Sequence, residues 1–147
     1  AVAGVLRREG IDAALAEAGT ALSGVVACPW GVVPAYEAVL AFLDTGVRPG
    51  ALVCLNDRIA MGTYQALQER GLRVPEDVAV VSFDGSELAG WLRPSLSSVQ
   101  IPYRDLGEIA FASLMAGTAG VQRIAMPLVR GLSTGWQADT PSRTSVG

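Results

Sequence analysis

Three polar side chains stand directly after two apolar runs, where ligand chemistry is expected. Asn56 and Asp57 follow the apolar run of residues 51–55. Asp84 follows a second apolar run at residues 78–83. A continuous apolar run is typical of a parallel strand that is buried on both faces. Ligands of open parallel sheets bind just beyond the carboxyl ends of the strands. We therefore predict that these amide and carboxylate groups lie at a ligand site.

Three further residues complete a candidate binding set with Asn56 and Asp84. Trp30 and Tyr103 each lie just past a predicted strand, and Arg7 lies just before the first predicted helix. An indole and a phenol offer flat apolar faces to a ring or to a sugar face. Arginine and aspartate form charge-assisted, directional hydrogen bonds, while an asparagine amide both donates and accepts. Pockets for small polar ligands combine such apolar walls with a few placed polar groups.

Each candidate also has an ordinary structural interpretation. Asp84 could simply begin a turn, and Asn56 could bond only to neighbouring backbone in its loop. For Asp57, a helix N-cap is favoured over a ligand contact. The two aromatic side chains could pack at a loop edge or against a helix, and the arginine could be a solvent-exposed surface residue. The sequence leaves these alternatives open.

The elements that must position these residues alternate between helix and strand. A helix over residues 57–70 joins the two apolar runs and ends at Gly71, with Pro75 shortly after. Strands that alternate with helices of this length predict an α/β fold with a mainly parallel, Rossmann-like sheet and helices on both faces. The other predicted elements are helix 11–18, strand 24–27, helix 34–43, strand 96–101, helix 103–116 and strand 123–129.

The segment of residues 51–84 resembles the effector-binding domain of LacI/GalR family transcription regulators. The family pattern is matched by L-N-D-R-I-A-M-G, which begins at Leu55, and by G-L-R-V-P-E-D-V, which begins at Gly71 and leads into the strand before Asp84. This composite, in order and at fixed spacing, is far more specific than a short motif. The chain departs from the family at Ser82, where Gly is usual, and at Gly85, where a second Asp is usual.

The resemblance implies a periplasmic-binding-protein-like fold of two Rossmann-like subdomains joined by three crossovers. By this analogy, residues 1–135 are part of an effector-binding domain, mostly its C-terminal subdomain. Helix 103–116 is then a crossover helix that belongs to an N-terminal subdomain absent from this sequence. Residues 136–147, which are rich in Thr, Ser and Gly, are predicted to form a flexible tail.

Carried over position by position, the resemblance assigns effector contacts to Arg7, Trp30, Asn56, Asp84 and Tyr103. Arg7 matches the arginine of an R-x-x-G pattern, and Asn56 and Asp84 match the N-D and F-D-D motifs. In the family, the effector closes the cleft between the subdomains and alters operator binding by a headpiece, which this sequence lacks. The implied effector is a small molecule, with a sugar favoured over a purine.

The resemblance also places a homodimer interface near Trp91 and Leu92, together with Met61. An exposed tryptophan in a monomer would be costly, so an interface is favoured over a ligand contact for Trp91. DNA contact would occur only through the headpiece of the full-length protein. The predicted location is the cytoplasm.

Composition limits the other classes of function. The 147 residues are 50% hydrophobic, carry a net charge of −3, and include neither histidine nor lysine. This charge argues against direct nucleic-acid binding by the chain, and the missing histidine excludes Ser-His-Asp and Cys-His catalysis. No apolar run reaches the ~20 residues of a membrane span. Cys28 and Cys54 are expected to be free thiols in a reducing compartment. We predict no cofactor and no metal.

Two rival functions share this fold class. A periplasmic sugar-binding protein of a transport system is the main alternative, although V-P-E-D-V at residues 74–78 favours the repressor branch. An enzyme is disfavoured because the chain has no G-x-G-x-x-G after a strand and no G-x-x-x-x-G-K-[ST]. A phosphoacceptor role for Asp57 or Asp84 lacks the required early acidic pair and the later lysine.

Overall fold

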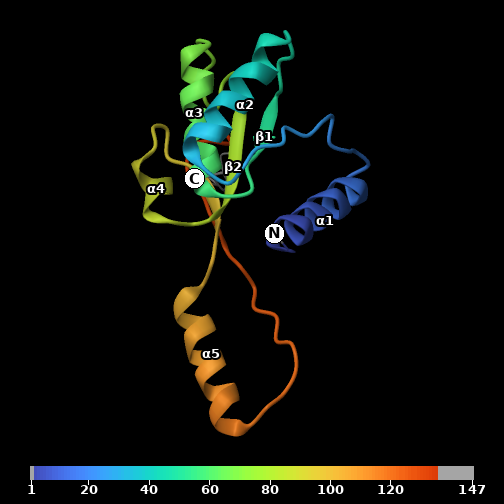
Figure 1. The fold of residues 1–147 in the computed structure, drawn as a ribbon, viewed down its shortest axis with the longest axis vertical. Helices are drawn as coiled ribbons and strands as arrows, with labels where there is room; N and C mark the ends of the chain where they lie inside the picture. The colour runs from blue at the N-terminus through green and yellow to red at the C-terminus, as the bar shows by residue number, and fades with distance from the viewer. Residues whose placement is uncertain (1, 136–147) are drawn as a thin grey trace, which may run out of the picture.

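The computed structural model describes residues 2–135, in which helices and strands alternate along most of the chain (Figure 1). No helix in this range is both long and apolar enough to cross a membrane. The elements in chain order are α1 (Val2–Glu17), α2 (Val32–Asp44), β1 (Ala51–Val53), α3 (Asp57–Glu69), β2 (Ala79–Asp84), α4 (Glu87–Trp91), β3 (Ser97–Gln100), α5 (Tyr103–Ala116) and β4 (Leu128–Val129).

The sheet has the strand order β1-β2-β3-β4. The first three strands are parallel, with Val53 paired to Val81 and Val81 paired to Ser97. Strand β4 runs antiparallel to β3. The predicted α/β class with a mainly parallel sheet is therefore confirmed. Because β1 and β2 are parallel, their carboxyl ends meet at one edge of the sheet, and this edge carries the candidate site.

The core lies where α2 and α3 pack on each other and on β2. Leu43, Leu67 and Val80 are almost completely buried there. Gly62 allows the two helices to approach closely, because a Cβ at this position would lie 2.2 Å from the Val32 carbonyl oxygen. The core therefore fixes the start of α3 relative to the end of β2, which are the two segments that hold the polar residues of the site.

Two predictions at the N-terminal end are wrong, one for the start of a helix and one for a strand. Helix α1 begins at Val2 and not at residue 11, so Arg7 lies inside the helix. The apolar periodicity that predicts this helix begins at Ile11, but α1 continues through Gly10, because glycine within a helix costs only about 1 kcal/mol. Residues 24–27 form no strand, because they make no ladder with β1 or with any other strand of the part described. An apolar run becomes a strand only when a neighbour pairs with its backbone.

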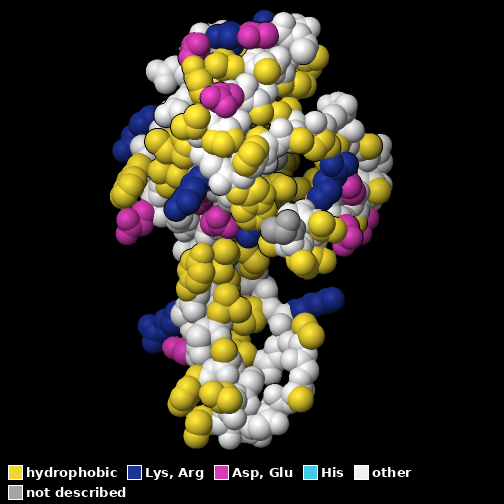
Figure 2. All heavy atoms as spheres, in the orientation of Figure 1, with side chains coloured by type: hydrophobic (Ala, Val, Ile, Leu, Met, Phe, Trp, Pro, Cys, Tyr) yellow, Lys and Arg dark blue, Asp and Glu magenta, His cyan; other side chains and the backbone are white. Residues whose placement is uncertain are grey.

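The other differences are smaller. The final strand covers residues 128–129 and not 123–129, and β2 extends to Asp84, which is its last residue. The predicted helix 103–116 is confirmed as α5, which extends away from the body formed by α2, α3 and the sheet (Figure 1). Neither α1 nor α5 contains a buried residue. Apolar side chains accordingly lie on the surface of the lobe that α5 forms (Figure 2). The predicted tail, 136–147, lies outside the described residues.

Candidate ligand-binding site

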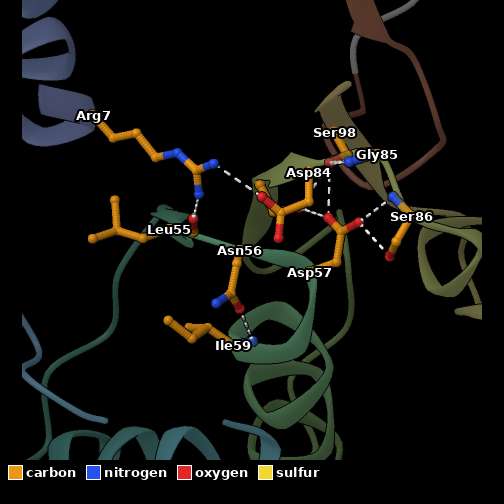
Figure 3. Close-up of polar contacts among 10 residues, drawn as sticks. Arg7, Leu55, Asn56, Asp57, Ile59, Asp84, Gly85, Ser86 and Ser98 are labelled. Atoms are coloured by element: carbon orange, nitrogen blue, oxygen red, sulfur yellow. Dashed lines mark hydrogen bonds and ion pairs between the residues drawn. The ribbon is translucent and has the colours of Figure 1, made fainter. Parts of the chain in front are cut away.

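An arginine and an aspartate form the centre of the site at the carboxyl edge of β1 and β2. Nη2 of Arg7 lies 3.0 Å from Oδ1 of Asp84, and Nη1 of Arg7 donates to the Leu55 carbonyl oxygen (Figure 3). Both side chains are only partly exposed, with 16% of Arg7 and 30% of Asp84 accessible. The pair is thus held in place while a part of each group stays open to a ligand.

Two aromatic rings flank the arginine. The Arg7 guanidinium carbon lies 5.6 Å from the centroid of the Trp30 ring and 5.1 Å from that of Phe83. These distances lie within the range of cation–π attraction. Gly4 leaves room for the indole, since a Cβ there would lie 3.3 Å from the Trp30 ring. The structure therefore brings together three of the predicted contact residues, and it adds Phe83, which the sequence analysis missed.

The backbone at Asp84 explains why Phe83 was missed. Adjacent side chains of a regular strand point to opposite faces, so Phe83 and Asp84 are not expected to share a neighbour. Asp84 instead has φ = 107°, a conformation that residues other than glycine rarely adopt. Such strain persists only where the surroundings hold it, and it clusters at binding and catalytic sites. Here both side chains contact Arg7.

Gly85 follows with φ = 62° and packs against β3. A Cβ at this position would lie 2.6 Å from Cα of Gln100, so no side chain fits without a shift of the backbone. Glycine at this position therefore permits a close contact between two backbone segments. Asp84 is left as the one carboxylate of this turn that faces Arg7.

Asn56 caps helix α3. Its Oδ1 accepts a hydrogen bond from the Ile59 amide at 2.7 Å, and the residue is buried (Figure 3). This is the backbone-bonding role that the sequence left open for Asn56. It corrects the assignment of the N-cap to Asp57, which is the first residue of the helix and not its cap. A ligand contact by the Asn56 amide remains a prediction.

Asp57 is instead the centre of a buried polar cluster with only 1% of its surface exposed. Its Oδ1 accepts hydrogen bonds from the hydroxyls of Ser82 and Ser98, the latter at 2.7 Å. Its Oδ2 accepts from both the amide and the hydroxyl of Ser86, each at 2.7 Å. These serines come from β2, β3 and the turn before α4, so no local pattern in the sequence predicts their contact with Asp57.

Tyr103 does not join the other candidates. It is the first residue of α5 and its side chain is 70% exposed. Within residues 2–135 no hydrogen bond or ring contact connects its side chain to Arg7, Trp30 or Asp84. Its role as a ligand contact remains a prediction from the resemblance.

The three predicted interface residues, Met61, Trp91 and Leu92, line one groove. This groove lies between α3 and α4, has a volume of about 670 Å³, and is also bordered by Arg73 and Pro94. Trp91 is 69% exposed. A second copy of the chain as the partner of this surface remains a prediction.

The described residues offer little reactive chemistry. Both cysteines are free thiols, and burial raises the pKa of Cys54 to about 12, so this thiol stays protonated at neutral pH. Burial also raises the pKa of Cys28. Within residues 2–135 no His, Cys, Asp and Glu side chains are grouped as a metal site. The arrangement around Arg7 and Asp84 is suited to hydrogen bonding and stacking.

Comparison with known proteins identifies the class of this domain. The family profile described as "Periplasmic binding protein-like domain" matches residues 2–134. The ribose operon repressor of Haemophilus influenzae is 36% identical over 123 residues, which are 82% of this chain and 35% of the repressor. The HTH-type transcriptional repressor PurR of Vibrio atlanticus is 36% identical over 94 residues, 64% of this chain and 27% of that protein.

A solved structure agrees with this result. The LacI family transcriptional regulator from Arthrobacter sp. FB24, in complex with lactose, superposes with a TM-score of 0.74 at 30% identity. The match covers 86% of this chain and 50% of that one. The chain therefore belongs to the periplasmic-binding-protein-like domain family. Within this family it is part of a LacI/GalR-type effector-binding domain. It spans about a third of the ribose operon repressor.

Proposed function

We propose that this chain is the ligand-sensing part of a LacI/GalR-type transcription regulator. A small effector binds at the carboxyl edge of β1 and β2, between this subdomain and the N-terminal subdomain of the full-length protein. The observation that supports this most is the cluster of Arg7, Trp30 and Asp84, in which the arginine bonds to the carboxylate and lies over the indole ring. The regulator acts in the cytoplasm and performs no catalysis.

A sugar is the effector class that this cluster fits best. The bond to Arg7 uses Oδ1 of Asp84, and within residues 2–135 no hydrogen bond reaches Oδ2, so this oxygen can accept from a sugar hydroxyl. The remaining N–H groups of Arg7 can donate to a neighbouring hydroxyl. Trp30 is 44% exposed and offers its ring to the apolar face of a sugar. Two similar proteins support this class: one is a ribose operon repressor, and the other is a LacI family regulator whose structure was solved in complex with lactose.

Regulation requires that the effector distinguish two states of the protein. A ligand shifts a conformational equilibrium only by its difference in affinity between those states. We propose that the effector favours the closed arrangement of the two subdomains. The change is then passed through a homodimer, which is formed at the groove lined by Met61, Trp91 and Leu92, to headpieces that bind the operator.

A thermal melting panel tests this function. The full-length regulator is heated with lactose, D-ribose, other common monosaccharides, adenine and hypoxanthine. A ligand that binds only the native state at ~100 times its Kd stabilises that state by about 2.7 kcal/mol. We expect a selective shift with one sugar or a few related sugars. Asp84→Ala should reduce this shift, whereas Leu43→Ala, a core variant, should keep it.

The outcomes separate the parts of the proposal. A shift caused only by a purine would replace the sugar assignment and retain the sensing function. No shift with any compound would refute the sugar assignment. A sugar shift of undiminished size in Asp84→Ala would refute the site.

A further inference from the structure

The Asp57 cluster connects four elements of the fold. Asp57 is the first residue of α3, and its partners are Ser82 on β2, Ser98 on β3 and Ser86, the N-cap of α4 (Figure 3). A buried carboxylate is stable only when its oxygens are satisfied by donors. Here two of the four hydrogen bonds come from one residue, Ser86, which lies two positions after Asp84.

Both amides that follow Asp84 are fixed by this cluster. The Ser86 amide donates to Oδ2 of Asp57 at 2.7 Å, and the Gly85 amide donates to the Ser98 hydroxyl at 2.9 Å. The Ser98 hydroxyl in turn donates to Oδ1 of Asp57 at 2.7 Å. The two peptide groups after Asp84 are therefore tied, directly or through one hydroxyl, to a single buried carboxylate.

This restraint acts where the chain is strained. Asp84 has φ = 107°, which costs free energy unless neighbouring groups hold it. On the N-terminal side Asp84 is held by the β2 ladder. On its C-terminal side the Asp84 carbonyl accepts from the Ile101 amide at 3.0 Å. On the C-terminal side the hydrogen bonds of the Gly85 and Ser86 amides lead to Asp57. Loss of that carboxylate would remove the bond of the Ser86 amide and weaken that of the Gly85 amide, which leaves the Asp84 carbonyl bond to Ile101 as the restraint on this side.

We propose that Asp57 is a positioning residue for ligand recognition. It does not touch the effector, but it holds the turn of residues 84–86 so that the Asp84 carboxylate faces Arg7 and the cleft. This inference relies on the proposed function in taking Asp84 as the ligand contact. Ser82 adds one more donor to the same carboxylate.

Hydrogen exchange of the full-length regulator tests the inference without any effector. The variants are Asp57→Asn, which keeps the size of the side chain, and Ser98→Ala, which removes the acceptor of the Gly85 amide. Residue-level mass spectrometry follows the amides of Gly85 and Ser86. The Val80 amide, which donates to the Ser133 carbonyl at 2.8 Å, serves as the internal reference in the sheet.

We expect Asp57→Asn to speed exchange at Gly85 and Ser86 at least tenfold more than at Val80. Ser98→Ala should show the same selectivity at Gly85, and it keeps the test decisive if Asp57→Asn does not fold. Leu43→Ala is the control, because a core cavity should speed exchange at all three amides by a similar factor. A uniform acceleration in the cluster variants, or none at the turn, would overturn the inference. Because no ligand is used, this result is independent of the melting panel.

Discussion

The strained backbone of Asp84 leads to a prediction that reverses the usual order of two substitutions. Asp84→Gly and Asp84→Ala both delete the carboxylate and its bond to Arg7, so the loss of that contact cancels when the two variants are compared. They differ in how each residue tolerates φ = 107°. In regular strands and helices, glycine is the less stable choice. Here we expect the glycine variant to be the more stable one.

The magnitude follows from two opposing terms. An alanine held at positive φ costs roughly 1–2 kcal/mol relative to its preferred regions. Glycine avoids this cost, but it loses about 0.4–1 kcal/mol more through the entropy of its unfolded chain. The difference leaves Asp84→Gly more stable than Asp84→Ala by on the order of 0.5–1 kcal/mol.

Urea unfolding of the two full-length variants under identical conditions measures this difference as a shift of the midpoint at constant slope. Both variants should bind an effector more weakly than the wild type. If Asp84→Ala were the more stable variant, the backbone at residue 84 would not be strained in solution. The account of a turn held in place for ligand recognition would then fail.

Two further predictions concern two glycines and the buried thiol of Cys54. Urea unfolding should show that Gly62→Ala destabilises the protein by about 1–3 kcal/mol, because the new Cβ would overlap the Val32 carbonyl oxygen. Gly10→Ala in α1 has open space around it, so it should be neutral or should stabilise the protein by up to about 1 kcal/mol. The stability of the protein should also fall as the pH rises from about 9 towards 12, because the Cys54 thiol ionises at its ordinary pKa of 9.0 when unfolded and at about 12 when folded. Cys54→Ala should flatten this decline between pH ~8 and pH ~10, although Tyr64, whose pKa is also raised to about 12, keeps part of it. An unchanged pH profile in that variant would contradict the burial of the thiol.

Much of the fold is visible in the sequence, because the signals that define it are local. A few adjacent residues are enough to predict the strand before Asp84, the start of a helix after Asn56 and the end of α5 at Gly117. The same local signals failed at residues 24–27, because pairing with β1 depends on the tertiary arrangement. They also failed before Ile11, where α1 extends back to Val2 without the apolar spacing seen in residues 11–18.

The site was only partly predictable for the same reason. The position of Asp84 follows from the end of a strand, but the contact between Arg7 and Trp30 joins a helix to a distant loop. The role of Asp57 as the centre of a buried cluster depends on serines from three separate segments, and single serines carry no signal in a sequence. Phe83 was missed because the conformation of its neighbour breaks the alternation of the strand.

The most direct test of the central claim is a calorimetric titration of the full-length regulator with lactose and with D-ribose. It compares the wild-type protein with Asp84→Gly, which keeps the turn, and with Leu43→Ala, which leaves the site intact. A hydrogen bond to a charged group contributes about 1.5–3 kcal/mol, so loss of the Asp84 contact should weaken binding roughly 10- to 150-fold. Leu43→Ala should bind as the wild type does. Equal affinity of Asp84→Gly and wild type for a sugar that binds would contradict a sugar site built on Asp84.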